Sequence, residues 1–191
     1  MATTWEEFTQ PSRSSNVAGG GTHAAFFFKD SSEKQSVLFQ LCTTALSEPC
    51  FILYIAGKQG TKGIRLSMKD AGIDVAGFER QKKLRIADSE EFYLNLARTA
   101  SFRTMEALSD AIQKIKKESQ DAGNELLMVI SETDQIVRKG FLRDYMEFEK
   151  SATMLVDNAS VTFICAYDER ELAAARVSKD EITKLHGQTI T

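Results

Sequence analysis

Apolar runs alternate with helical stripes of apolar residues from residue 23 onward. Five short runs are rich in strand-forming residues, and the segments between them repeat apolar residues at every third or fourth position. The runs are almost continuously apolar, as parallel strands buried on both faces are. We therefore predict strands at residues 24–28, 50–56, 84–87, 126–130 and 161–167.

The segments between the predicted strands carry the signals of helices. A capping box, Ser32 with Gln35, precedes the first stripe, and a second one, Ser178 with Glu181, precedes the last. The alternation predicts an α/β fold of three layers, in which helices cover both faces of a mainly parallel, five-stranded sheet. Helices are expected around residues 37–45, 64–71, 89–98, 105–122, 141–155 and 178–186.

The first 21 residues have a different composition from the rest. Trp5 and Phe8 are isolated apolar residues, and the segment that follows is rich in serine and glycine. Such a composition buries too little apolar surface to order itself. We predict a flexible N-terminal arm over residues 1–21 and a single domain over residues 22–191. The alternative is an arm that docks on a neighbouring chain through Trp5 and Phe8.

Composition narrows the class of protein. With 24 basic and 27 acidic residues the net charge is −3, so the chain has no basic field for direct nucleic-acid binding. No apolar run approaches the roughly 18 residues that a membrane span needs, and we expect a cytoplasmic protein without a membrane partner. The three cysteines show no Cys-x-x-Cys pair and are expected to be reduced and mostly buried. They are Cys42, Cys50 and Cys165.

The turn after the first predicted strand lacks a phosphate-binding loop. Residues 29–32 read Lys-Asp-Ser-Ser, where a P-loop NTPase would carry Gly-x-x-x-x-Gly-Lys-Ser/Thr. No nucleophile elbow of the Gly-x-Ser-x-Gly type occurs either. The sequence therefore favours binding or sensing over catalysis, and we predict neither an enzyme nor a bound cofactor.

Candidate ligand-binding residues follow the predicted strands, because open α/β sheets bind ligands at the carboxyl ends of their strands. Glu132 follows a buried run, where a P-loop enzyme places its magnesium-linked carboxylate. The alternative for Glu132 is a solvated acid or a helix cap. Tyr167 and Asp168 offer either ligand contacts or, respectively, core cover and a turn cap. The strand-end candidates are Lys29, Asp30, Glu132, Tyr167 and Asp168.

Two further candidates lie away from these strand ends. Glu149 lies near the edge of a helical stripe, which favours the surface; facing inward, it would need a partner. His23 begins the first strand, so in a parallel sheet it should lie roughly 15 Å or more from Glu132. A metal site of His23, Cys165 and Glu132 is the alternative, but no ligand spacing groups these residues, and we predict no metal site.

Six segments, taken in order, carry a resemblance to a known family: Gly21-Thr22-His23, residues 50–55, residues 71–75, Ser131-Glu132, Phe148-Glu149 and residues 164–168. Together they resemble the MEDS family, the methanogen/methylotroph DcmR sensory domain. The resemblance extends over residues 21 to 187. Thr22 and Phe148 depart from the family's usual Gly-Asp-His and Tyr-Glu motifs, whereas His23 and Glu149 match them.

The resemblance implies a RecA/KaiC-like domain that has lost its P-loop and senses simple hydrocarbon derivatives or other small molecules. In the family such a domain is often joined to a DNA-binding domain or a histidine kinase. Neither is expected within these 191 residues, so we expect the signal to pass to a separate signalling or transcription partner, or through homo-oligomers.

We therefore consider three hypotheses for the function. The first is a small-molecule sensing module, for which His23 and Glu149 join the strand-end candidates as ligand-binding residues. The alternative is a degenerate RecA-like interaction scaffold that oligomerises or pairs with an ATPase or regulator. Residual nucleotide binding is the third, and the missing phosphate loop argues against it.

Overall fold

The computed structural model describes the chain except residues 1–20, 94–104, 141, 157–160 and 191. The predicted arm therefore lies outside the described residues, apart from Gly21. Of the helix predicted over 89–98, residues 89–93 are helical and the remainder also lies outside them.

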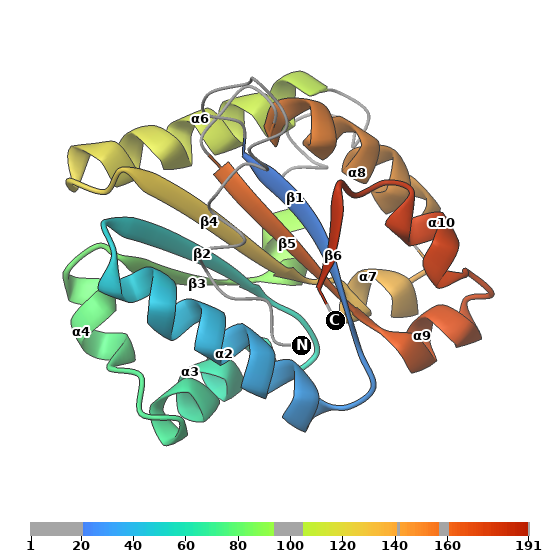
Figure 1. Cartoon of the computed structure of the whole chain (residues 1–191), viewed down its shortest axis with the longest axis horizontal. Coiled ribbons are helices and arrows are strands. Elements are labelled where there is room, and N and C mark those ends of the chain that lie inside the picture. The colour runs from blue at the N-terminus through green and yellow to red at the C-terminus, as the bar shows by residue number, and fades with distance from the viewer. Residues whose placement is uncertain (1–20, 94–104, 141, 157–160, 191) are drawn as a thin grey trace.

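Six parallel strands form one sheet in the order β3-β2-β4-β5-β1-β6 (Figure 1). The prediction of five strands was one short. The missed strand, β6, has only three residues, and two of them, Gln188 and Thr189, are exposed. It lacks the apolar run that identified the other strands. The strands are β1 (Thr22–Phe28), β2 (Cys50–Ala56), β3 (Leu84–Asp88), β4 (Leu126–Glu132), β5 (Val161–Asp168) and β6 (Gln188–Ile190).

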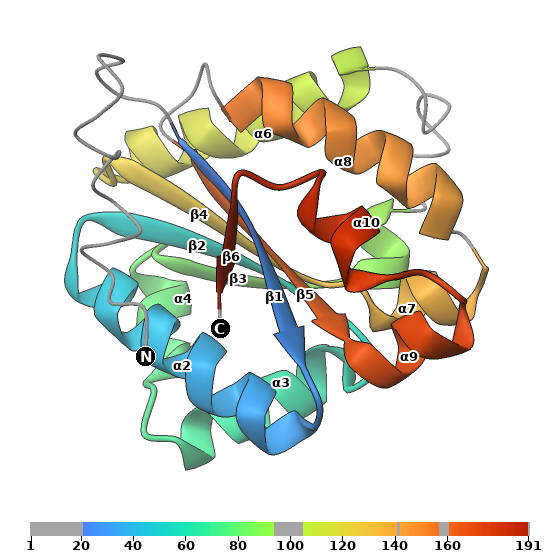
Figure 2. The ribbon, with the colours of Figure 1, turned by 45° about the vertical axis from the view of Figure 1, so that its right-hand side comes forward.

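Helices cover both faces of the sheet, so the predicted three-layer α/β architecture is confirmed (Figures 1 and 2). Helices α2, α3 and α4 pack on one face, and α6 to α10 pack on the other. Their bounds are α2 (Ser31–Ser47), α3 (Gly60–Asp70), α4 (Val75–Arg80), α6 (Met105–Asp121), α7 (Asp134–Arg138), α8 (Leu142–Val156), α9 (Glu169–Ala174) and α10 (Lys179–Thr183).

Alternate residues of each central strand enter two separate cores. In β4, Met128 and Ile130 pack towards α2, whereas Leu127 and Val129 pack towards α6 and α8. Both faces are therefore apolar, which explains why the central strands read as continuous apolar runs rather than alternating ones. A residue's parity along its strand decides which core it enters.

Helix caps agree with the sequence at one end of the chain and differ at the other. The predicted capping box of Ser178 and Glu181 is present at the start of α10. At α2, however, the N-cap is Asp30, whose carboxylate accepts hydrogen bonds from the backbone N–H groups of Ser32 and Glu33. Asp30 is preferred over Ser32 because its charge also interacts favourably with the helix N-terminus.

Within the described part of the chain, no helix is both long and apolar enough to cross a bilayer.

Candidate functional site

The seven predicted ligand-binding residues fall into separate places rather than one site. His23, Glu149 and Tyr167 come together in the core between the sheet and α8. Glu132 lies in the other core, on the α2 side of the sheet. The remaining three, Lys29, Asp30 and Asp168, lie at strand ends.

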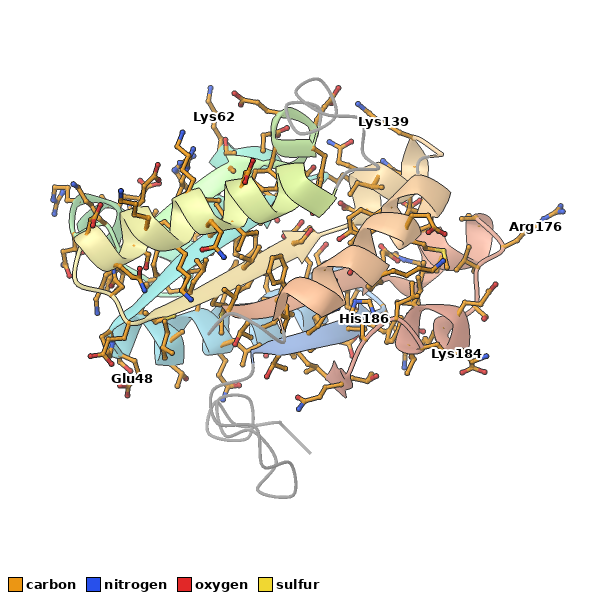
Figure 3. All side chains as sticks on the ribbon, turned by 90° about the horizontal axis from the view of Figure 1, so that it is seen from above. Glu48, Lys62, Lys139, Arg176, Lys184 and His186 are labelled. Atoms are coloured by element: carbon orange, nitrogen blue, oxygen red, sulfur yellow. The ribbon has the colours of Figure 1, made fainter. Side chains whose placement is uncertain are left out.

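The pairing of β1 with β5 sets the first part of the buried group. His23 lies opposite Phe163 and Ala25 opposite Cys165, so His23 and Cys165 are diagonal neighbours on adjacent strands. Both side chains enter the core beneath α8. Helix α8 contributes Glu149, and the turn after α10 contributes His186, which lies beside α8 in Figure 3. We call His23, Glu149, Cys165 and His186 the histidine cluster.

The polar atoms of the histidine cluster converge closely. Nε2 of His23 lies 2.7 Å from Oε2 of Glu149. Sγ of Cys165 lies 3.6 Å from that nitrogen and 3.5 Å from that oxygen. Nε2 of His186 lies 3.4 Å from the same oxygen. The four donor atoms all lie within 4.8 Å of one another, so a single small ion or polar group could contact every one of them.

Burial makes this arrangement costly unless the polar groups satisfy one another. Glu149 is fully buried, and His23 and His186 are 4% and 8% exposed. The surface position that the helical pattern favoured for Glu149 was therefore wrong. The pattern failed because Glu149 lies at the margin of the apolar stripe, where α8 still faces the sheet and the segment after α10 covers it. The partners that an inward Glu149 would need are present.

His186 is oriented by a backbone contact. Its Nδ1 lies 2.8 Å from the carbonyl oxygen of Ile182 and must donate the hydrogen bond, because a carbonyl can only accept. In the neutral ring this leaves Nε2 with a lone pair facing Glu149. Among the described residues, that nitrogen is buried without a hydrogen-bond partner. The separation of 3.4 Å from Glu149 is therefore a proximity rather than a formed hydrogen bond.

Two tyrosines and a phenylalanine contact the cluster. Tyr167 donates to Oε1 of Glu149 at 3.2 Å, and Tyr145 donates to Sγ of Cys165 at 3.7 Å. Phe163 meets the ring of His23 edge-on, with the centroids 6.2 Å apart. The cluster is thus a small polar centre enclosed by aromatic side chains.

Burial and the two imidazoles act in opposite directions on the acids. Burial alone would raise the pKa of Glu149, but the adjoining His186 and His23 outweigh it and lower that pKa well below the ordinary value. For Cys165, burial and the negative charge of Glu149 both raise the pKa of the thiol well above the usual range. Without a bound ion, the cluster therefore holds the carboxylate of Glu149 beside the protonated thiol of Cys165.

Glu132 belongs to a second buried group. Its Oε2 accepts hydrogen bonds from Nζ of Lys34 at 2.8 Å and from the backbone N–H of Gly57 at 3.1 Å. Its Oε1 accepts from the hydroxyl of Tyr54 at 2.6 Å. Lys34 is only 4% exposed and Glu132 is fully buried. Both carboxylate oxygens are therefore engaged by neighbours, which differs from the solvated acid and the helix cap considered above.

The strand-end candidates form local contacts. Asp30 caps α2, and Asp168 caps α9 through the backbone N–H of Arg170. Burial raises the pKa of Asp168, but hydrogen bonds from Arg170 outweigh it and lower that pKa. Lys29 is exposed, and its backbone N–H donates to the side chain of Glu33. These contacts match the capping alternative for Asp168.

The sheet itself separates His23 from Glu132. The two enter opposite cores, which agrees with the expectation that they do not share a site. The metal combination of His23, Cys165 and Glu132 is therefore wrong in its carboxylate, because Glu149 takes that place beside His23. Sequence reasoning did not include His186, whose only signal was that it is one of two histidines in the chain.

A cavity of about 490 Å³ lies elsewhere, beside the edge strand β3. Its charged lining residues are largely paired with one another, Arg65 with Glu79 and Arg85 with Glu118. None of the seven predicted site residues lines it.

Comparisons with known proteins agree with this architecture. A KaiC-like protein from the hyperthermophilic archaeon Pyrococcus horikoshii OT3 superimposes with a TM-score of 0.52 at 13% sequence identity. The match covers 78% of this chain and 62% of that one, and at this identity it shows the fold alone. No curated protein matches the chain. The family model of the methanogen/methylotroph, DcmR sensory domain matches residues 22–186, and the chain therefore belongs to this MEDS family of sensory domains.

Proposed function

We propose that this sensory domain is a non-catalytic module that binds a small organic molecule at the histidine cluster and passes the signal to a partner chain. The observation that carries the proposal is the contact between His23 and Glu149, 2.7 Å apart and closed off from water. A buried acid beside a buried base, with a perturbed pKa, is a common mark of a binding site.

The surroundings of the cluster set the class of ligand. Its polar atoms converge on one point, whereas Phe163, Tyr145 and Tyr167 enclose that point with aromatic surface. A compact molecule with one polar group and a short apolar part matches both features. Simple hydrocarbon derivatives, such as short alcohols, amines and aldehydes, have this character.

The other buried group supports a ligand that is not a nucleotide. The ammonium of Lys34 lies near the start of α2, where a P-loop lysine would hold phosphates, but here it is bound to Glu132. Freeing both charges for Mg²⁺ and phosphate would leave each without its partner in a buried site, which is costly. We therefore assign no nucleotide hydrolysis to the domain.

The elements that carry the cluster indicate which part of the domain would transmit the signal. Glu149 is on α8, and His186 follows α10, so a molecule entering between these side chains would displace outer elements rather than the central sheet. The face formed by α8 and α10 is the part that we expect a separate signalling or transcription partner, or a second copy of the chain, to read.

The test is thermal melting against a panel of C1 to C4 alcohols, halides, amines, aldehydes and acids, with ATP–Mg²⁺ as a separate arm. A ligand that binds the native state raises the melting temperature by mass action. We expect a selective shift from one organic class, lost in Glu149→Gln and kept in Glu147→Gln. Glu147 lies on the same helix but is exposed. A shift with ATP alone, or equal shifts in both variants, would contradict the proposal.

A further inference from the structure

Three of the six separations among the donor atoms of the histidine cluster have the length expected in a tetrahedral metal site, and all six are within 4.8 Å. Zn²⁺ binds nitrogen and oxygen ligands at about 2.0–2.2 Å and sulfur at about 2.3 Å, so tetrahedral ligands are about 3.4 Å apart for N and O and about 3.6 Å apart when one is S. Oε2 of Glu149 lies 3.4 Å from Nε2 of His186 and 3.5 Å from Sγ of Cys165. Sγ of Cys165 lies 3.6 Å from Nε2 of His23. Three separations therefore match.

The separation between His23 and Glu149 is short in a way that coordination would relieve. Nε2 of His23 and Oε2 of Glu149 lie 2.7 Å apart, the length of a direct hydrogen bond or ion pair. A cation between these two atoms would replace the shared proton, and the pair would widen by roughly 0.7 Å to reach the tetrahedral edge.

His186 supplies an independent observation. Its Nδ1–H is held by the carbonyl oxygen of Ile182, so the ring is fixed with Nε2 towards the cluster. That nitrogen is buried and, among the described residues, has no hydrogen-bond partner. A metal-binding imidazole has this arrangement: one nitrogen donates to a carbonyl and the other presents its lone pair to the ion.

Neighbouring groups complete the outer shell that such ligands require. Tyr167 donates to the second oxygen of Glu149, and Tyr145 donates to the sulfur of Cys165. A divalent ion would also balance the charges, since one thiolate and one carboxylate with two neutral imidazoles sum to zero around it. A buried site without net charge avoids the desolvation penalty of an unpaired ion.

We propose that His23, Glu149, Cys165 and His186 bind one divalent transition-metal ion of the Zn²⁺ class. The mixture of thiolate, imidazole and carboxylate selects such an ion over Mg²⁺ or Ca²⁺, which prefer oxygen ligands alone. The inference deepens the proposed function and rests on it only for the sensing role: an incoming molecule with a hydroxyl, amine or thiol would compete with Glu149 for the ion. Metal binding itself stands on the geometry.

The experiment uses Co²⁺ as the probe, because a thiolate ligand gives it a charge-transfer band and four-coordinate geometry gives it strong visible bands. The full chain is unfolded in denaturant with a chelator to remove any metal. The chelator is then removed and the chain is refolded with Co²⁺, so that a closed site can fill during folding. We expect one Co²⁺ per chain with both spectral signatures, and displacement by Zn²⁺. A chain that refolds, as judged by circular dichroism, without these bands would overturn the inference.

The three buried cysteines provide matched variants. Cys165→Ser should lose the charge-transfer band, whereas Cys42→Ser and Cys50→Ser, in the opposite core, should keep it. His186→Asn removes a proposed ligand and should weaken Co²⁺ binding at least as much as loss of an outer-shell partner does, by roughly tenfold or more. A band that persists in Cys165→Ser, or Co²⁺ affinity unchanged in a folded His186→Asn chain, would contradict the assignment.

Running the organic panel on Zn²⁺-loaded and metal-free chains separates the two proposals. A selective organic shift in a chain that never binds Co²⁺ would leave sensing standing and remove the metal. Co²⁺ binding with the expected cysteine dependence, without any organic shift, would establish the metal site and remove the organic ligand.

Discussion

His23 of β1 and Glu149 of α8 join the sheet to the helical layer through side-chain atoms 2.7 Å apart. Their contact is buried, and Tyr167 of β5 donates to the second oxygen of the same carboxylate. One carboxylate therefore ties together two strands and a helix. We expect the stability of this layer to depend on these few atoms, and under the proposed function the response to a ligand depends on the same atoms.

Replacing Glu149 with glutamine should lower the free energy of unfolding. The amide keeps the shape but removes the charge that His23 and His186 face, and disturbing a buried polar contact costs about 1–3 kcal/mol. Urea unfolding of the metal-free chain measures the loss. The exposed Glu147→Gln on the same helix should change stability by less than about 0.5 kcal/mol. Equal effects of the two substitutions would show that the buried contact is not stabilising.

The buried pair of Lys34 and Glu132 should show strong coupling. Lys34→Met leaves the carboxylate buried without its cation, which typically costs about 3–5 kcal/mol. Adding Glu132→Gln removes that stranded charge, so the double variant should recover part of the loss. A double-mutant cycle by urea unfolding measures the coupling. Additive losses would contradict the pairing, and Lys58→Met, at an exposed position, provides the control.

Gly57 should not tolerate a side chain. A methyl group there would overlap Oδ1 of Asp134 and come within 2.9 Å of Cβ of Glu132. Asp134 would have to move away from the backbone N–H of Lys58, which it now accepts from. We expect Gly57→Ala to destabilise the chain by about 1–3 kcal/mol, as overpacked sites do. Thermal unfolding would test this.

Gly63 provides the matched control for Gly57. It lies inside α3, and the three atoms nearest to an added methyl there all belong to the side chain of Gln59, which is exposed and would have to shift. Gly63→Ala should leave stability unchanged or raise it by up to about 1 kcal/mol, because alanine is the better helix former. A loss at Gly63 as large as that at Gly57 would show that backbone effects, rather than the clash, are responsible.

The cap of α9 should depend on pH. The pKa of Asp168 is lowered in the folded chain, so its stabilising contribution is present above the unfolded value of about 3.9 and is lost as the pH falls through the folded value. Asp168→Ala should cost about 1 kcal/mol at pH 7. Urea unfolding at pH 7 and pH 3 should show a smaller difference between wild type and variant at pH 3. A difference that grows in acid would reverse the sign expected here.

Local signals were sufficient for most of the architecture. The runs at 50–56 and 161–167 read as buried strands because both faces of a central parallel strand are apolar, and that requirement acts on each residue separately. Strand β6 was missed because an edge strand of three residues with two exposed polar side chains has no such run. The absence of a phosphate-binding loop was also evident from the sequence, because such a loop is formed by consecutive residues.

The candidate site depended on the tertiary structure. The sequence alone determined the strands, the helical stripes and the identity of His23 and Glu149 as candidates. Only the strand order, which places β1 beside β5, brought His23 next to Cys165, and only the packing of α8 and of the turn after α10 added Glu149 and His186. The physical reason is that strand order and helix docking minimise the free energy of the whole core. No stretch of neighbouring residues encodes them.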